Sequence, residues 1–99
     1  MIAIRQTEYF AGWFANLRDR QAKLRIQARI DRAALGNTGD AAPVGEGVSE
    51  MRIHYGPGYR VYFTQRGHTL IVLLAGGDKR TQGQDIETAL KLARELEDS

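Results

Sequence analysis

The chain has 99 residues and a net charge of +2, with 26% charged residues, 42% hydrophobic residues and no cysteine. A chain of this length forms one domain around one hydrophobic core, and the lack of cysteine excludes disulfides and thiolate metal sites. Two histidines are too few for a zinc site, the N-terminus lacks a secretory signal, and no apolar run approaches the roughly 20 residues of a membrane span. We therefore expect a single cytoplasmic domain over residues 1–99, with no membrane association, metal or cofactor.

The first part of the chain is predicted to be a short strand followed by two helices. Residues 2–6 alternate weakly in polarity, as a strand does, and Thr7 is a candidate N-cap. The first helix then has an apolar stripe at helical spacing, formed by Phe10, Trp13, Phe14 and Leu17. Asp19 can begin the second helix and Gly36 can end it, with one apolar face formed by Ala22, Ile26, Ile30 and Ala33. Two helices with almost no linker predict a helical hairpin that covers one face of a sheet.

The second part is predicted to supply the rest of that sheet and a last helix. Residues 36–47, with four glycines and a proline, predict a loop, and residues 48–63 predict a β-hairpin. Residues 70–75 are apolar on both faces, which favours a central strand, and residues 83–97 have the apolar periodicity of a helix. This order predicts a small α+β domain with a mostly antiparallel sheet. All helices are expected on one face, which leaves the other face open around the hairpin.

The hairpin concentrates polar side chains on that open face. Because side chains alternate along a strand, one face is apolar and the other carries Glu50, Arg52, His54, Arg60 and Tyr62. With the Gly-Pro-Gly at 56–58 as the loop, His54 is expected opposite Arg60 and Arg52 opposite Tyr62, about 5 Å apart. Like charges placed opposite each other destabilise a sheet, but such a cluster is well suited to hold a phosphate.

Two other basic segments can extend this surface. The segment Gly76-Gly77-Asp78-Lys79-Arg80 lacks the spacing of a nucleotide-binding P-loop. It is expected to form a turn that brings Lys79 and Arg80 to the same rim and whose amides add anion-binding capacity. The second helix is basic, and Arg25 and Arg29 are candidate RNA contacts on it; a solvated helix face is the alternative interpretation.

These groups suit RNA cleavage without a metal. A base removes the proton of the 2′-hydroxyl, cations stabilise the charge that develops on the phosphorane, and an acid protonates the leaving 5′-oxygen. Histidine titrates near neutral pH, so His54 can act as base or acid. The guanidinium fork matches phosphate oxygens, so Arg52 and Arg60 are candidate phosphate clamps.

The chain resembles the RelE/HigB toxins of bacterial toxin–antitoxin modules, in particular the subgroup called addiction module killer proteins. The resemblance runs over nearly the whole chain. Its segments are Phe10, Trp13, Phe14 and Leu17; Arg29-Ile30; residues 36–40; residues 48–53; residues 56–63; residues 76–79; and Gln82, Asp85 and Ile86. The Gly-Pro-Gly-Tyr-Arg and Gly-Gly-Asp-Lys pieces, in this order, are its most specific part.

The resemblance implies a microbial-ribonuclease-like fold and a ribosome-dependent mRNA endonuclease that inhibits translation. It implies that Arg60 stabilises the transition state, and that Arg52 and His54 are the basic pair of the preceding strand. His54 takes the place of a lysine that acts as the base. Lys79 and Arg80 follow the last strand, where an arginine is expected to act on the leaving group, and either can be that residue. The implied partners are the ribosome, mRNA and a cognate antitoxin, expected to be a helix-turn-helix protein from the adjacent gene.

One position departs from the family pattern. Members often place a tyrosine or histidine in the final helix region, stacked on the substrate base, where this chain has Gln84-Asp85-Ile86. Either Tyr62 takes that place from the open face, or the substrate is held differently. Two other functions stay open: a ParE-like toxin that binds DNA gyrase and has no nuclease site, and an inactive module that only binds the antitoxin.

Overall fold

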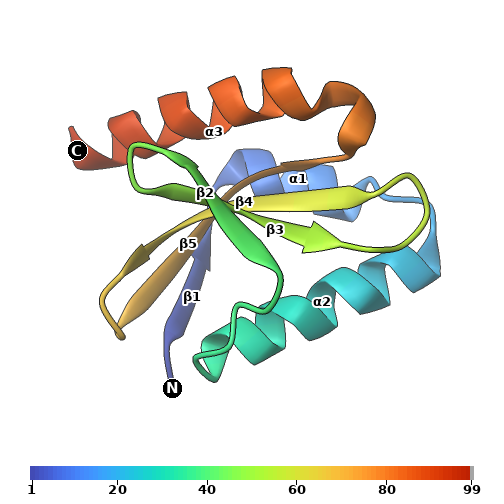
Figure 1. Ribbon diagram of the computed structural model, residues 1–99, viewed down its shortest axis with the longest axis horizontal. Coiled ribbons are helices and arrows are strands. Elements are labelled where there is room, and N and C mark those ends of the chain that lie inside the picture. Colours follow the sequence, from blue (N-terminus) through green and yellow to red (C-terminus); the bar gives the residue numbers. More distant parts are fainter. Residues whose placement is uncertain (99) are drawn as a thin grey trace.

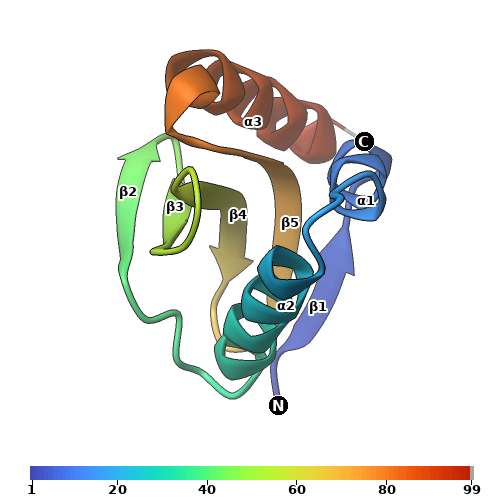
Figure 2. The same ribbon diagram turned by 90° about the vertical axis from the view of Figure 1, so that its right-hand side faces the viewer.

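The computed structural model describes residues 1–98 as a five-stranded sheet with three α-helices (Figure 1). The elements are β1 (Ala3–Gln6), α1 (Glu8–Ala15), α2 (Arg20–Ala34), β2 (Ala41–Gly45), β3 (Val48–Ile53), β4 (Tyr59–Arg66), β5 (Leu70–Gly77), the 3-10 turn η1 (Lys79–Thr81) and α3 (Gln82–Glu97). The strand order is β1-β5-β4-β3-β2, seen from β2 on the left to β1 on the right in Figure 2. Only β1 and β5 are parallel, so the predicted α+β class with a mostly antiparallel sheet is confirmed.

The helix starts lie where the sequence places them, whereas α1 ends at Ala15, before Leu17 of the predicted stripe. The hydroxyl of Thr7 accepts from Phe10 N at 3.0 Å and caps α1. The carboxylate of Asp19 accepts from Gln21 N and Ala22 N and caps α2. These bonds satisfy amides that have no partner inside the helix. The chain leaves α2 through Gly36, whose φ of 98° suits glycine.

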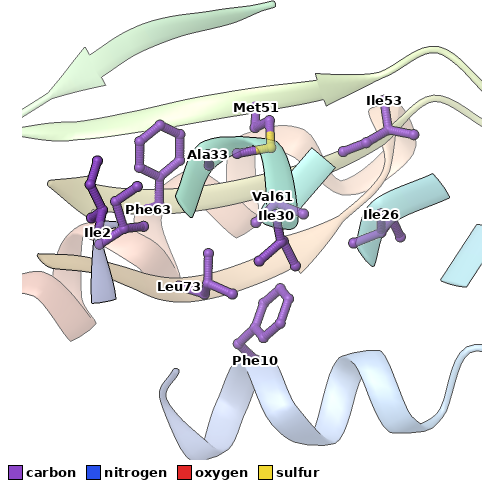
Figure 3. Packing of buried hydrophobic residues seen from close by; sticks show 11 residues of the cluster. Ile2, Phe10, Ile26, Ile30, Ala33, Met51, Ile53, Val61, Phe63 and Leu73 are labelled. Atoms are coloured by element: carbon purple, nitrogen blue, oxygen red, sulfur yellow. The ribbon is translucent and has the colours of Figure 1, made fainter. Parts of the chain in front are cut away.

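The first hydrophobic core lies between α1, α2 and one face of the sheet. In Figure 3, Phe10 from α1 and Ile26, Ile30 and Ala33 from α2 point toward the strand residues Met51, Ile53, Val61, Phe63 and Leu73. All of these side chains are buried. The predicted apolar faces of both helices and of the hairpin are therefore confirmed.

The second core lies on the opposite face, and it corrects the prediction that all helices share one side. The helix α3 packs through Ala89, Ile86 and Leu90 on a cluster that includes Tyr62 and Leu74. Figure 1 shows α3 and α2 on opposite sides of the strands. The run at 70–75 is apolar on both faces, and such a strand is buried on both faces. A single helical layer leaves half of that run exposed to water, so α3 covers the second face.

Two predicted loops are strands. Residues 36–47 contain β2, an edge strand in which Ala41 pairs with Met51 and Ala42 with Glu50. Its Ala-Ala-Pro sequence has little strand propensity, but Pro43 is tolerated at a sheet edge.

Gly76 and Gly77 are the last residues of β5, not a turn that surrounds an anion. A Cβ on Gly76 would lie within 2.6 Å of three ring carbons of Trp13, and one on Gly77 would lie within 2.6 Å of the carboxyl carbon of Asp85. These glycines therefore allow close packing on both faces of the strand.

Candidate nucleic-acid interface

The register of the β3–β4 hairpin differs from the predicted one by two residues. Arg52 is opposite Arg60, and Glu50 is opposite Tyr62. The loop is residues 54–58, because Tyr55 leaves the strand: its hydroxyl donates to Asp19 at 2.9 Å, and the Arg25 guanidinium lies 4.7 Å from its ring centroid. The expected pairing of His54 with Arg60 is therefore wrong. A shift of two residues keeps each side chain on its face, so the two arginines still share one.

A buried carboxylate pairs with both of these arginines. Glu50 is 4% exposed and accepts from Gln82 Nε2 at 2.8 Å. It forms ion pairs with Arg60 Nε at 3.6 Å and with Arg52 Nη2 at 3.4 Å. Arg60 is itself 8% exposed. The repulsion expected between paired arginines is thus offset by a residue to which the sequence assigned no role.

A second carboxylate, Asp40, holds the histidine of the hairpin loop. The Nε2 atom of His54 lies 2.5 Å from Asp40 Oδ2, and Arg52 Nη1 lies 3.4 Å from Asp40 Oδ1. The hydrogen bond from His54, aided by the charge of Arg52, lowers the pKa of the Asp40 carboxyl. Sequence reasoning missed Asp40, because it lies in the segment predicted as a loop. Recognition of β2 would have found it, since the pairing of Ala41 with Met51 places Asp40 beside Arg52.

Arg29, predicted to bind RNA, is engaged by the backbone. Its Nη1 donates to the carbonyl of Arg52, and its Nη2 donates to those of Thr38 at 3.0 Å and Asp40 at 3.3 Å. Burial lowers the pKa of the Arg29 guanidinium, although the charge of Asp40 opposes that shift. Arg29 therefore fixes the segment that presents Asp40 to His54.

The two cations after β5 have different surroundings. The aliphatic stem of Lys79 lies against Gly58 of the hairpin loop, where a Cβ would be 2.9 Å from Lys79 Cε. The expected approach of Lys79 to the hairpin is confirmed. Arg80 pairs instead with Asp78 at 3.0 Å. The hydrogen bond from Arg80 lowers the pKa of Asp78. In Figure 1 the hairpin loop lies between the start of α3 and α2.

The expectation that Tyr62 stacks on a substrate base is wrong. Its side chain is 0% exposed, in the core beneath α3. Its hydroxyl is buried without a hydrogen-bond partner in the part of the chain that is described. Burial, with the charge of Glu50, raises the pKa of the Tyr62 phenol. A face covered by α3 cannot present this ring to a nucleic acid.

Neither a metal cluster nor a membrane span is evident in residues 1–98. No group of three or more histidine, cysteine, aspartate or glutamate side chains is placed there to hold an ion. None of the helices described is long and apolar enough to cross a membrane.

The fold and the site define a small α+β protein with a basic hairpin whose charges are balanced by two carboxylates. The chain is 46% identical over 95 residues to an uncharacterized protein of Haemophilus influenzae, and the match covers 96% of each chain. It belongs to the same family as that protein. No protein-family model matches the chain.

Proposed function

We propose that the protein is a toxin of the RelE/HigB type, an endoribonuclease that cleaves mRNA on the translating ribosome and so inhibits translation. The observation that carries this proposal is the position of Arg52 opposite Arg60, with His54 at the start of the hairpin loop and held by Asp40. A phosphodiester bound at this end of the β3–β4 hairpin would contact the guanidiniums of Arg52 and Arg60 and the imidazole of His54.

In the proposed reaction His54 is the base. Its Nε2 is engaged by Asp40, so Nδ1 takes the proton of the 2′-hydroxyl, and the Asp40 carboxylate stabilises the imidazolium that forms. The 2′-oxygen then bonds to phosphorus, and the bond from phosphorus to the 5′-oxygen breaks. The products are a 2′,3′-cyclic phosphate and a 5′-hydroxyl end. His54 is suited to this role because its side chain is 72% exposed.

The cations stabilise the charges that develop in this reaction. Arg52 and Arg60 bind the non-bridging oxygens of the phosphorane. The substrate phosphate competes with Glu50 for these two guanidiniums. Lys79 has no ion-pair partner within residues 1–98 and lies beside the hairpin loop, whereas Arg80 is paired with Asp78. Between the two, this favours Lys79 as the acid that protonates the 5′-oxygen.

Induced expression in a bacterial host tests the proposal. Wild type should arrest growth, stop translation and fragment mRNA, and co-expression of the adjacent antitoxin gene should reverse the arrest. His54→Ala and Arg60→Ala should abolish these effects. His68→Ala and Arg66→Ala are matched controls, because both residues are exposed and lie away from the hairpin loop, Arg66 at the end of β4 and His68 in the turn before β5.

Three results would contradict the proposal. If folded variants of His54 and Arg60 are as toxic as wild type, these two residues do not form the catalytic site. An early DNA-damage response with intact mRNA would favour a ParE-like gyrase toxin. Tight antitoxin binding without any growth arrest would favour an inactive module.

A further inference from the structure

A hollow of about 260 Å³ lies between α2 and the end of β3, and His54 is part of its lining. Its lining is formed by Arg25, Ala28, Arg29, Arg32, Ile53 and His54. The four helix residues follow the spacing i, i+3, i+4 and i+7, which places them on one ridge of α2. Three arginines therefore line one hollow.

Asp40, which is bonded to His54 and whose charge acts on Arg29, balances only part of the charge in this hollow. Arg52, Arg60, Arg80 and Arg94 each have a carboxylate partner. Arg25 and Arg32 form no ion pair with any carboxylate of residues 1–98, and Asp40 is not part of the lining. Like charges three or four residues apart destabilise a helix by a few tenths of a kcal/mol per pair. An anion bound between them would remove that repulsion.

The three arginines of the ridge differ in what they can offer to an anion. The Arg29 guanidinium already donates to the carbonyls of Arg52, Thr38 and Asp40, so it supplies a fixed positive charge rather than a free donor. Arg32 is exposed in the last turn of α2. Arg25 lies against the face of Tyr55, which holds its planar group in place. Arg25 and Arg32 therefore have donors left for a ligand.

We propose that this hollow is a phosphate-binding pocket in which Arg25 and Arg32 are the ligands. It takes a phosphate group next to the one bound by Arg52 and Arg60, and His54 lies between the two positions. With RNA as the source of the phosphate, the inference rests on the proposed nuclease function. The bound RNA then runs from α2 across His54 toward Lys79. Free inorganic phosphate is the other source of the same chemistry.

Binding of a short single-stranded RNA with 2′-O-methyl groups tests the pocket without cleavage, because the attacking hydroxyl is blocked. Fluorescence anisotropy at several salt concentrations gives its Kd and salt slope. Arg25→Gln and Arg32→Gln should each weaken binding about tenfold, as expected for a hydrogen bond to a charged group. Each should also reduce the slope of log K against log salt by about 0.7. Arg18→Gln, the same change at an exposed residue before α2, should alter neither.

A second measurement identifies the source of the phosphate. Backbone amide NMR shifts of Ala28 and His54 should move on addition of the oligonucleotide, and millimolar inorganic phosphate should compete weakly. Saturation by inorganic phosphate with no response to the oligonucleotide would support the pocket with a free anion as its ligand. Unchanged affinity and salt slope in both variants, with no shift caused by either anion, would overturn the pocket. Arginine-dependent binding by a protein that does not cleave mRNA would refute the nuclease function and leave the pocket standing.

Discussion

The close contact between Gly76 and Trp13 provides a sharp test of how the sheet packs. In Gly76→Ala the added Cβ would lie within 2.6 Å of three ring carbons, whereas carbon atoms in contact are about 3.5–4.0 Å apart. The indole therefore has to retreat by about 1 Å or more. It has little room to do so, because its ring centroid lies 5.7 Å from that of Phe10 and 6.3 Å from that of Tyr59.

Forced overpacking of this kind costs about 1–3 kcal/mol of the free energy of unfolding. For a chain of this size each kcal/mol lowers Tm by about 4–8 °C. Urea unfolding can be followed by fluorescence, since Trp13 is the single tryptophan. Gly12→Ala is the matched control: apart from its chain neighbours and the nearby backbone of its own helix, no atom lies within 4 Å of its added Cβ, and in a helix the change should stabilise by about 0.5–1 kcal/mol. A Gly76→Ala protein as stable as wild type, with unchanged emission, would refute this packing.

Three further predictions concern buried or half-buried polar groups. Tyr62→Phe removes a hydroxyl that has no partner among residues 1–98; the free energy of unfolding should stay unchanged or rise by up to about 1 kcal/mol, and a clear loss in urea unfolding would contradict this. Arg29→Gln removes the guanidinium that donates to the carbonyls of Arg52, Thr38 and Asp40, of which the Asp40 carbonyl keeps the amide of Arg52 as a donor. It should cost about 2–4 kcal/mol in the same assay, while Arg20→Gln, at an exposed residue, should cost little. Burial raises the pKa of the Asp85 carboxyl, so between its unfolded pKa of about 3.9 and its folded pKa the folded state binds more protons. Its contribution to stability should therefore fall as pH rises through that window, by at most about 1.4 kcal/mol per pH unit. Asp85→Asn should lack this dependence, and an identical pH profile in the two proteins would show that the carboxyl is not perturbed.

The elements that the sequence predicts well are those whose signals are local. Thr7 and Asp19 are helix caps in both the prediction and the structure, and the apolar spacing of α1 and α2 identifies their buried faces. The side of the sheet that α3 covers is not a local property. The apolar periodicity of α3 shows that one face of the helix is buried, but it does not show which face of the sheet that helix covers. The run at 70–75 does indicate a second helical layer, because a strand that is apolar on both faces has to be covered on both faces.

The sequence predicts the cations of the candidate site but not the carboxylates that pair with them. Arg52, Arg60 and His54 do gather at one end of the hairpin, although in a register shifted by two residues because Tyr55 is bound by Asp19 and Arg25. Asp40 reaches His54 only through the pairing of β2 with β3, which the weak strand propensity of residues 41–45 concealed.

Identification of the RNA ends made by the purified protein tests the proposed function most directly. Programmed ribosomes should yield mRNA fragments with a 2′,3′-cyclic phosphate on one side of the cut and a 5′-hydroxyl on the other. His54→Ala and Arg60→Ala proteins, shown to be folded by their unfolding curves, should yield no such ends, and His68→Ala should yield as many as wild type. Fragments with 5′-phosphate ends, or no fragments from wild type on translating ribosomes, would contradict the account.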